Sequence, residues 1–130
     1  MPSFDSRFEQ FIADSFDSEE AVMIVLTLRK AARPLTAGEV FDQLLRYGVD
    51  PTEERRLAEK RVELRMRDLA GRGLVRRETG GRFIYETNDA AIDELADRLI
   101  VEFEQRRSDL NRLIYGSAAR ARRLAEAFRL

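Results

Sequence analysis

The sequence contains no cysteine, no histidine and no tryptophan in its 130 residues. Without cysteine the chain forms no disulfide bond, no thiolate metal site and no thiol redox centre. Without histidine it lacks the commonest metal ligand and the usual general base at neutral pH, so we expect no cofactor, no metal site and no enzymatic activity. No apolar run approaches the roughly 20 residues of a membrane-spanning helix, and we expect no membrane association. The first residues carry no basic segment followed by an apolar stretch, which favours a cytoplasmic protein.

Charge is distributed unevenly along the chain, although the net charge is only −1. Residues 1–54 carry a net charge of −6, whereas residues 55–82 hold 10 basic and 4 acidic side chains and carry +6. Hydrophobic residues make up 44% of the sequence and recur periodically, which is typical of one folded core rather than a disordered chain. The sequence therefore predicts one domain with a basic segment in its middle.

Apolar spacing predicts three helices in the first 48 residues. Residues 4–15 place Phe4, Phe8 and Phe11 on one stripe, which covers a core, forms a subunit contact or lines an apolar pocket. A second helix follows the capping residues 17–20 and ends before Pro34. The third begins at a capping box, Thr36 with Glu39, and ends at Gly48. We expect the second of these helices to be central, because residues 22–26 are apolar on all sides.

Residues 53–70 contain no glycine or proline and predict one long helix. At 100° per residue the apolar side chains of this segment form one stripe, and the basic side chains lie opposite it or at its flank. The basic side chains either bind an anionic partner or only solvate the helix and pair with carboxylates at i,i+4 spacing. The core stripe consists of Ala58, Val62, Met66 and Leu69; the opposite side holds Arg56, Lys60, Arg61, Leu64 and Arg67, with Arg65 at the flank.

Residues 74–79 and 82–87 predict two strands joined by the two-residue turn Gly80-Gly81. In that register Arg77 lies opposite Ile84, and Thr79 lies opposite Arg82. Arg77 and Arg82 would then share one face of the hairpin.

Residues 89–115 predict a single helix of about 40 Å with three heptads, longer than a small core requires. Such a helix is typical of a coiled coil, so we expect a homodimer. Arg106 lies within the stripe, where it either extends to solvent or pairs with Glu102 or Asp109. A last amphipathic helix is expected in residues 117–130. The residues expected to form the dimer contact are Phe4, Phe8, Phe11, Ile92, Ala96, Leu99, Phe103, Leu110 and Leu113.

The order of helices followed by a hairpin is typical of a winged helix-turn-helix domain. Residues 35–40 (LTAGEV), 69–77 (LAGRGLVRR) and 83–85 (FIY) resemble the winged helix-turn-helix transcriptional regulators of the MarR and TrmB-like groups. Gly48 and Gly73 lie 25 residues apart, about two helical turns more than in those regulators, so residues 51–58 either lengthen the recognition helix or form a separate turn. The resemblance covers residues 18–87, and residues 89–115 resemble the dimerisation helix of those groups.

This resemblance implies a homodimer that places two recognition helices in successive major grooves of double-stranded DNA. It assigns base contacts to Arg61, Leu64 and Arg65 and the wing tip to Arg82. The predicted fold is mainly α (α+β), with an N-terminal helix (1–17), a winged helix-turn-helix domain (18–88) and C-terminal dimerisation helices (89–130). The candidate DNA-binding residues are Arg56, Lys60, Arg61, Leu64, Arg65, Arg67, Arg77 and Arg82.

The predicted function is therefore a dimeric DNA-binding transcriptional regulator. The alternative is a winged-helix module that binds protein and not DNA, and the carboxylates of Glu53 and Glu54 favour it because they would repel phosphates. The family resemblance allows a small-molecule effector, but no residue of the chain indicates one.

Overall fold

The computed structural model describes residues 4–48 and 53–116, which form two compact units. One unit contains residues 20–88, and the other contains the N-terminal residues up to Glu19 together with the chain from Asp89 onwards. The described residues are mainly helical with one small antiparallel sheet, which confirms the α+β class. Within these residues, no helix is both long and apolar enough to cross a bilayer. The helix expected in residues 117–130 lies outside the described residues.

Three helices form most of the unit of residues 20–88: α2 (Glu19–Ala31), α3 (Ala37–Arg46) and α4 (Arg55–Gly71). The capping box at the start of α3 is confirmed: Thr36 Oγ1 accepts from the Glu39 backbone N–H at 3.2 Å, and Glu39 Oε1 accepts from the Thr36 N–H at 3.0 Å. Beyond the end of α3, Gly48 has a φ of +91°, a conformation that glycine adopts without strain. The local signals in the sequence therefore set both ends of α3.

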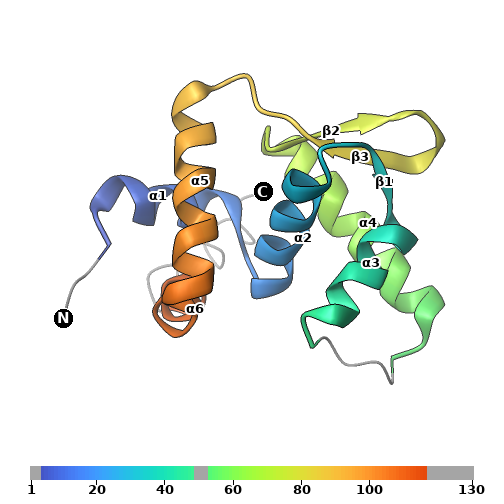
Figure 1. Cartoon of the computed structure of the whole chain (residues 1–130), viewed down its shortest axis with the longest axis horizontal. Coiled ribbons are helices and arrows are strands. Elements are labelled where there is room, and N and C mark those ends of the chain that lie inside the picture. The colour runs from blue at the N-terminus through green and yellow to red at the C-terminus, as the bar shows by residue number, and fades with distance from the viewer. Residues whose placement is uncertain (1–3, 49–52, 117–130) are drawn as a thin grey trace, which may run out of the picture. The chain divides into compact units, whose positions relative to one another are not determined.

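The sheet has the strand order β1-β3-β2, with β1 at Leu35–Thr36, β2 at Val75–Glu78 and β3 at Arg82–Tyr85. The short strand β1 was not expected from the sequence. Figure 1 shows the helices α2, α3 and α4 on one side of this sheet. Leu35 and Phe83 are paired across the sheet and are both buried, so the sheet joins the helical core through this face.

The register of the hairpin differs from the predicted one. Arg77 pairs with Phe83 and Glu78 pairs with Arg82, because the turn contains three residues, Thr79–Gly81, rather than two. Both glycines of the turn have positive φ angles, 75° and 70°. Since successive residues of a strand alternate between faces, Arg77 and Arg82 lie on opposite faces of the hairpin and not on the same face.

The other unit is built from α1 (Ser6–Ser15), α5 (Ala90–Gln105) and α6 (Arg107–Tyr115). The single helix predicted for residues 89–115 is wrong, because the backbone leaves the helical conformation at Arg106, with φ −136° and ψ 44°. After this break α6 contacts α1, as α5 does. A straight helix would have carried the last apolar residues of the stripe away from α1.

Arg106 itself pairs with both carboxylates that the sequence suggested. Its guanidinium lies 3.4 Å from Glu102 and 3.4 Å from Asp109, and it also stacks over the ring of Phe4 at 4.2 Å from the centroid. The guanidinium of Arg106 therefore lies at the break between α5 and α6, where two carboxylates balance its charge and an aromatic ring packs against it.

The residues expected to form a dimer contact are mostly buried within the single chain. The rings of Phe4 and Phe8 lie 5.1 Å apart, and those of Phe8 and Phe11 lie 6.4 Å apart. Packing inside one chain therefore accounts for the burial of this stripe, and no second chain is needed to cover it. The buried members of the set are Phe4, Phe8, Phe11, Ala96, Leu99, Phe103 and Leu110, whereas Ile92 and Leu113 are half-buried.

Candidate nucleic-acid interface

Helix α4 has one fully buried side and one exposed side, as its periodicity predicts. The side chains of Ala58, Val62, Met66 and Leu69 are all 0% exposed. This stripe fixes the rotation of the helix, because a turn about its axis would expose apolar surface. The side chains that the structure leaves exposed on the opposite side include Arg56, Lys60, Leu64 and Arg67.

Two of these exposed cations are available to a ligand. Arg56 and Lys60 form no ion pair with any residue that the structure describes. Arg67 lies 3.0 Å from Glu63 one turn earlier, and both side chains are substantially exposed. An exposed i,i+4 pair of this kind contributes only a few tenths of a kcal/mol, so an anion of a partner competes with it readily.

Arg61 and Arg65 are placed differently from the prediction, which put them on the exposed side or its flank. Arg61 donates two hydrogen bonds to the carboxylate of Glu20 on α2, at 2.8 and 2.9 Å, and a further one to Glu53. Arg65 donates from Nε to the same Glu20 carboxylate at 2.9 Å. The two arginines assigned to base contacts therefore join α4 to α2.

The carboxylate of Glu20 is shielded from water, since only 14% of its side chain is exposed. The hydrogen bonds that Arg61 donates to Glu20, and then to Glu53, raise the pKa of its guanidinium above the ordinary value. Charge-assisted and bidentate hydrogen bonds are the strong ones in proteins, and breaking them leaves a shielded charge without a partner. We therefore remove Arg61 and Arg65 from the candidate base-reading set.

The hairpin supplies two further cations without an acidic neighbour among residues 4–48 and 53–116. Arg77 on β2 and Arg82 on β3 are exposed and form no ion pair within that part of the chain. Arg76, by contrast, lies 2.9 Å from Glu86 and also pairs with Glu78. Because Arg77 and Arg82 lie on opposite faces near the turn, they present positive charge on both sides of the tip.

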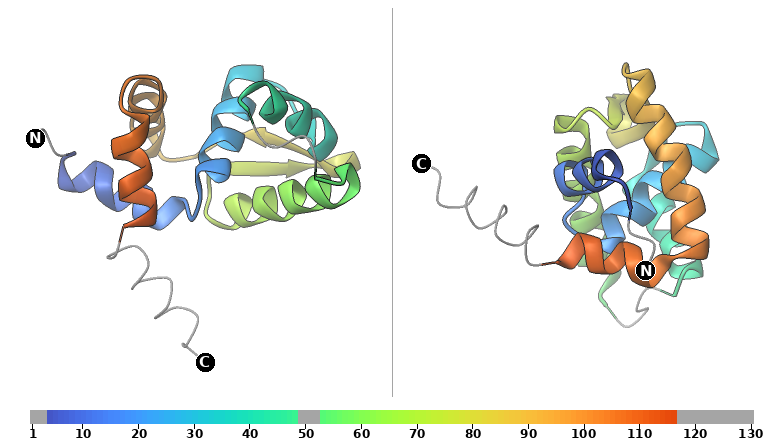
Figure 2. Two further views of the ribbon diagram at one scale, coloured as in Figure 1. Left: turned by 90° about the horizontal axis from the view of Figure 1, so that it is seen from below. Right: turned by 90° about the vertical axis from the view of Figure 1, so that its left-hand side faces the viewer.

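The hairpin tip and the N-terminal end of α4 lie on the same side of this unit. Both are at the right in Figure 1, the hairpin tip at the top and the N-terminal end of α4 at the bottom, and both are again at the right in the view from below in Figure 2. Arg56 and Lys60 belong to the first two turns of α4, and Arg82 directly follows the hairpin turn. Four cations without acidic partners among the described residues thus lie on two elements, α4 and the hairpin, of the unit that contains the basic segment.

The sequence reasoning missed two features of this surface. Leu64, which the periodicity put opposite the core, is 54% exposed, but Leu57, which was not singled out, is 58% exposed and lies on the same side of α4 seven residues earlier. This spacing of seven residues was visible in the sequence. The role of Glu20 had no local signal, since it lies 41 residues before Arg61.

Comparison with known proteins gives no relative from which to transfer a function. No family model matches the chain, and neither the curated proteins nor the solved structures give a match. The function of this surface therefore follows only from its residues and their geometry.

Proposed function

We propose that this chain is a homodimeric DNA-binding transcriptional regulator of the winged helix-turn-helix type. Helix α4 enters the major groove, and the hairpin of β2 and β3 is the wing that contacts the flanking backbone. The observation that carries this proposal is the set of exposed cations without acidic partners among the described residues, on α4 and the hairpin of one unit: Arg56, Lys60, Arg77 and Arg82.

The order of elements supports the winged-helix assignment. A helix, a short strand, two further helices and an antiparallel hairpin follow one another, and β1 pairs with β3 of the hairpin. In winged helix-turn-helix domains the last helix before the hairpin reads the groove. Here that helix is α4, whose buried stripe and ion pairs with Glu20 hold it against the rest of the unit.

The exposed side of α4 has both chemistries that a groove contact uses. Arg56 and Lys60 can neutralise phosphates or donate hydrogen bonds to guanine. Leu57 and Leu64 can contact the methyl groups of thymine. Because Arg61 and Arg65 are bound to Glu20, the side chains that contact the bases are the outward-facing ones of Lys60, Leu64 and Arg67.

The test is a fluorescence-anisotropy titration of a mixed-sequence duplex at about 50 and 200 mM salt. Four cations in each protomer of a dimer give eight phosphate contacts and a slope of about −7, so affinity falls by about 10⁴-fold over this range. The variant Arg56→Gln/Lys60→Gln keeps half of these contacts, so between the same two salt concentrations its own affinity should fall by only about 150-fold.

The matched control removes two exposed arginines of the other unit. Arg7 forms no ion pair within the described chain, and Arg112 is 70% exposed with only a 3.5 Å pair to Asp109. The variant Arg7→Gln/Arg112→Gln changes the net charge by the same amount, and it should keep the salt slope of the wild type. Equal slopes in both double variants, or no binding at 50 mM salt, contradict the proposal.

A protein-binding module is the second candidate function, and one specific observation favours it. Leu57 and Leu64 leave more than half of each side chain in water on the same side of α4. Apolar side chains gathered on one surface are typical of protein contacts as well as of groove contacts. The same titration separates the two functions, because a protein-binding module shows no duplex binding at low salt.

The homodimer is tested separately from DNA binding. Multi-angle light scattering should give twice the chain mass of 15.0 kDa. Val101 on α5 is 46% exposed and is our candidate for the subunit contact, in place of the buried residues of the stripe. Val101→Glu should therefore give a folded monomer, whereas a dimer that tolerates this change has its contact elsewhere.

A further inference from the structure

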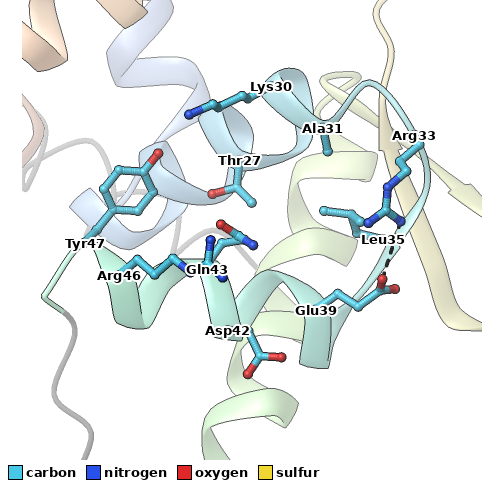
Figure 3. A pocket seen from close by; sticks show the side chains of 10 residues that line it. All are labelled: Thr27, Lys30, Ala31, Arg33, Leu35, Glu39, Asp42, Gln43, Arg46 and Tyr47. Atoms are coloured by element: carbon cyan, nitrogen blue, oxygen red, sulfur yellow. Dashed lines mark hydrogen bonds and ion pairs between the residues drawn. The ribbon is translucent and has the colours of Figure 1, made fainter.

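A groove between α2 and α3 lies outside the surface assigned to DNA. It has a volume of about 450 Å³, which is within the range of small-molecule sites. Figure 3 shows its lining side chains, with Lys30, Arg46 and Tyr47 toward one end and the pair of Arg33 and Glu39 at the other. The groove therefore has two chemically different ends.

The two acids of the groove already have partners. Glu39 lies 3.4 Å from Arg33, and Asp42 lies 2.7 Å from Arg55 of α4. Lys30 and Arg46, in contrast, form no ion pair with any other residue in the described part of the chain. The end of the groove near Tyr47 consequently carries two positive charges that no described carboxylate neutralises.

Polar and apolar groups continue from this cationic end along the groove. The amide of Gln43 and the hydroxyl group of Thr27 lie beside the cations in Figure 3, and Ala31 and Leu35 follow toward the other end. Thr27 Oγ1 donates its proton to the carbonyl oxygen of Met23 at 2.7 Å, so toward the groove it offers only an acceptor and a methyl group. A ligand would thus meet positive charge first and a small apolar surface next.

We propose that this groove binds a small organic anion, with a carboxylate or phosphate group between Lys30 and Arg46. The apolar part of the ligand lies on Ala31 and Leu35. Charge-assisted hydrogen bonds from both cations hold the anionic group, and the volume of about 450 Å³ admits a small organic molecule. The proposal does not depend on DNA binding, since none of the groove residues belongs to the DNA-binding set.

The test is an NMR titration of the ¹⁵N-labelled full-length chain with butyrate, inorganic phosphate and the uncharged amide butyramide. Butyrate and phosphate distinguish the two anionic groups, and butyramide measures the contribution of the apolar part alone. We expect saturable shifts of the amide resonances of Thr27, Ala31 and Gln43 with at least one anion. The variant Lys30→Gln/Arg46→Gln should weaken that binding by about tenfold or more.

The control variant Arg7→Gln/Arg112→Gln should bind the anion as the wild type does, because both of its positions lie outside the groove. Thermal unfolding of each variant shows whether it is folded, and the exposed positions of all four side chains favour unchanged midpoints. Three results overturn the proposal: no saturable shift with either anion, equal weakening in both double variants, or butyramide binding as tightly as the anions.

Discussion

The ion pairs of Glu20 with Arg61 and Arg65 lead to a quantitative prediction about stability. Glu20→Gln keeps the shape of the side chain but removes the charge that three guanidinium hydrogen bonds share. Both arginines then remain half-buried on α4, and Arg61 keeps a second carboxylate, that of Glu53. The expected result is a weaker attachment of α4 to α2.

The size of the effect follows from the exposure of the partners. A fully buried pair costs about 3–5 kcal/mol when one partner is removed, whereas an exposed pair costs about 0–1 kcal/mol. Glu20 is 14% exposed, and the two arginines are 31% and 27% exposed. These values place the loss between the two limits, at about 1–2 kcal/mol of the free energy of unfolding.

Urea unfolding followed by circular dichroism measures this loss. With a slope of about 1.5 kcal/mol per molar urea, the midpoint should fall by about 1 M. Glu63→Gln is the matched control, because Glu63 pairs with Arg67 on the exposed side of the same helix. That change should cost less than about 0.5 kcal/mol.

Equal losses for Glu20→Gln and Glu63→Gln would refute the assignment of Arg61 and Arg65 to a structural network. Duplex binding gives an independent readout under the proposed function. The released arginines should steepen the salt slope by about 0.9 for each new phosphate contact. An unchanged slope together with lost stability would mean that Arg61 and Arg65 do not reach DNA even when released.

Four further predictions concern other parts of the fold. The Arg107 side chain, and then Asn111, lower the pKa of Glu19, so its charge stabilises the fold above its ordinary pKa. The stability that Glu19→Gln lacks at pH 6 should be lost from the wild type as the pH falls through this lowered pKa, in urea titrations at successive pH values. Thr36→Ala should lower the free energy of unfolding by about 1 kcal/mol, whereas Thr36→Ser, which keeps the capping hydroxyl group, should lower it by much less. Phe103→Ala should cost about 3–5 kcal/mol while light scattering shows an unchanged oligomer; a split dimer of unchanged stability would contradict its burial. Gly81 has a φ of 70°, which alanine adopts only with strain, so Gly81→Ala should lower the free energy of unfolding by about 1 kcal/mol; the readout is a lower midpoint of thermal unfolding.

Features that depend on neighbouring residues in the chain could be predicted from the sequence. The capping box of Thr36 and Glu39 and the glycines of the hairpin act over a few residues, and the structure has both. The buried stripe of α4 was also predicted, because helical periodicity reports directly which side faces the core. These signals sufficed for most elements of the unit of residues 20–88.

Features that depend on distant contacts could not be predicted in the same way. Arg61 is directed to Glu20 by the packing of α4 against α2, and no spacing along α4 reveals that partner. The heptad pattern of residues 89–115 is equally compatible with a partner helix and with α1 of the same chain, so the break at Arg106 was missed. The hairpin register failed because Gly80-Gly81 fits a two-residue or a three-residue turn.

The division of α4 into an anchored side and an outward side separates folding from recognition. Val62, Met66 and the ion pairs with Glu20 hold the helix, and none of them lies at position 56, 60, 64 or 67. Under the proposed function, a combinatorial library of substitutions at those four positions should therefore vary which duplexes are bound while leaving the scaffold intact. If the proposal holds, the same arrangement would let duplicated copies of such a chain acquire different target sites in evolution without first accumulating stabilising changes.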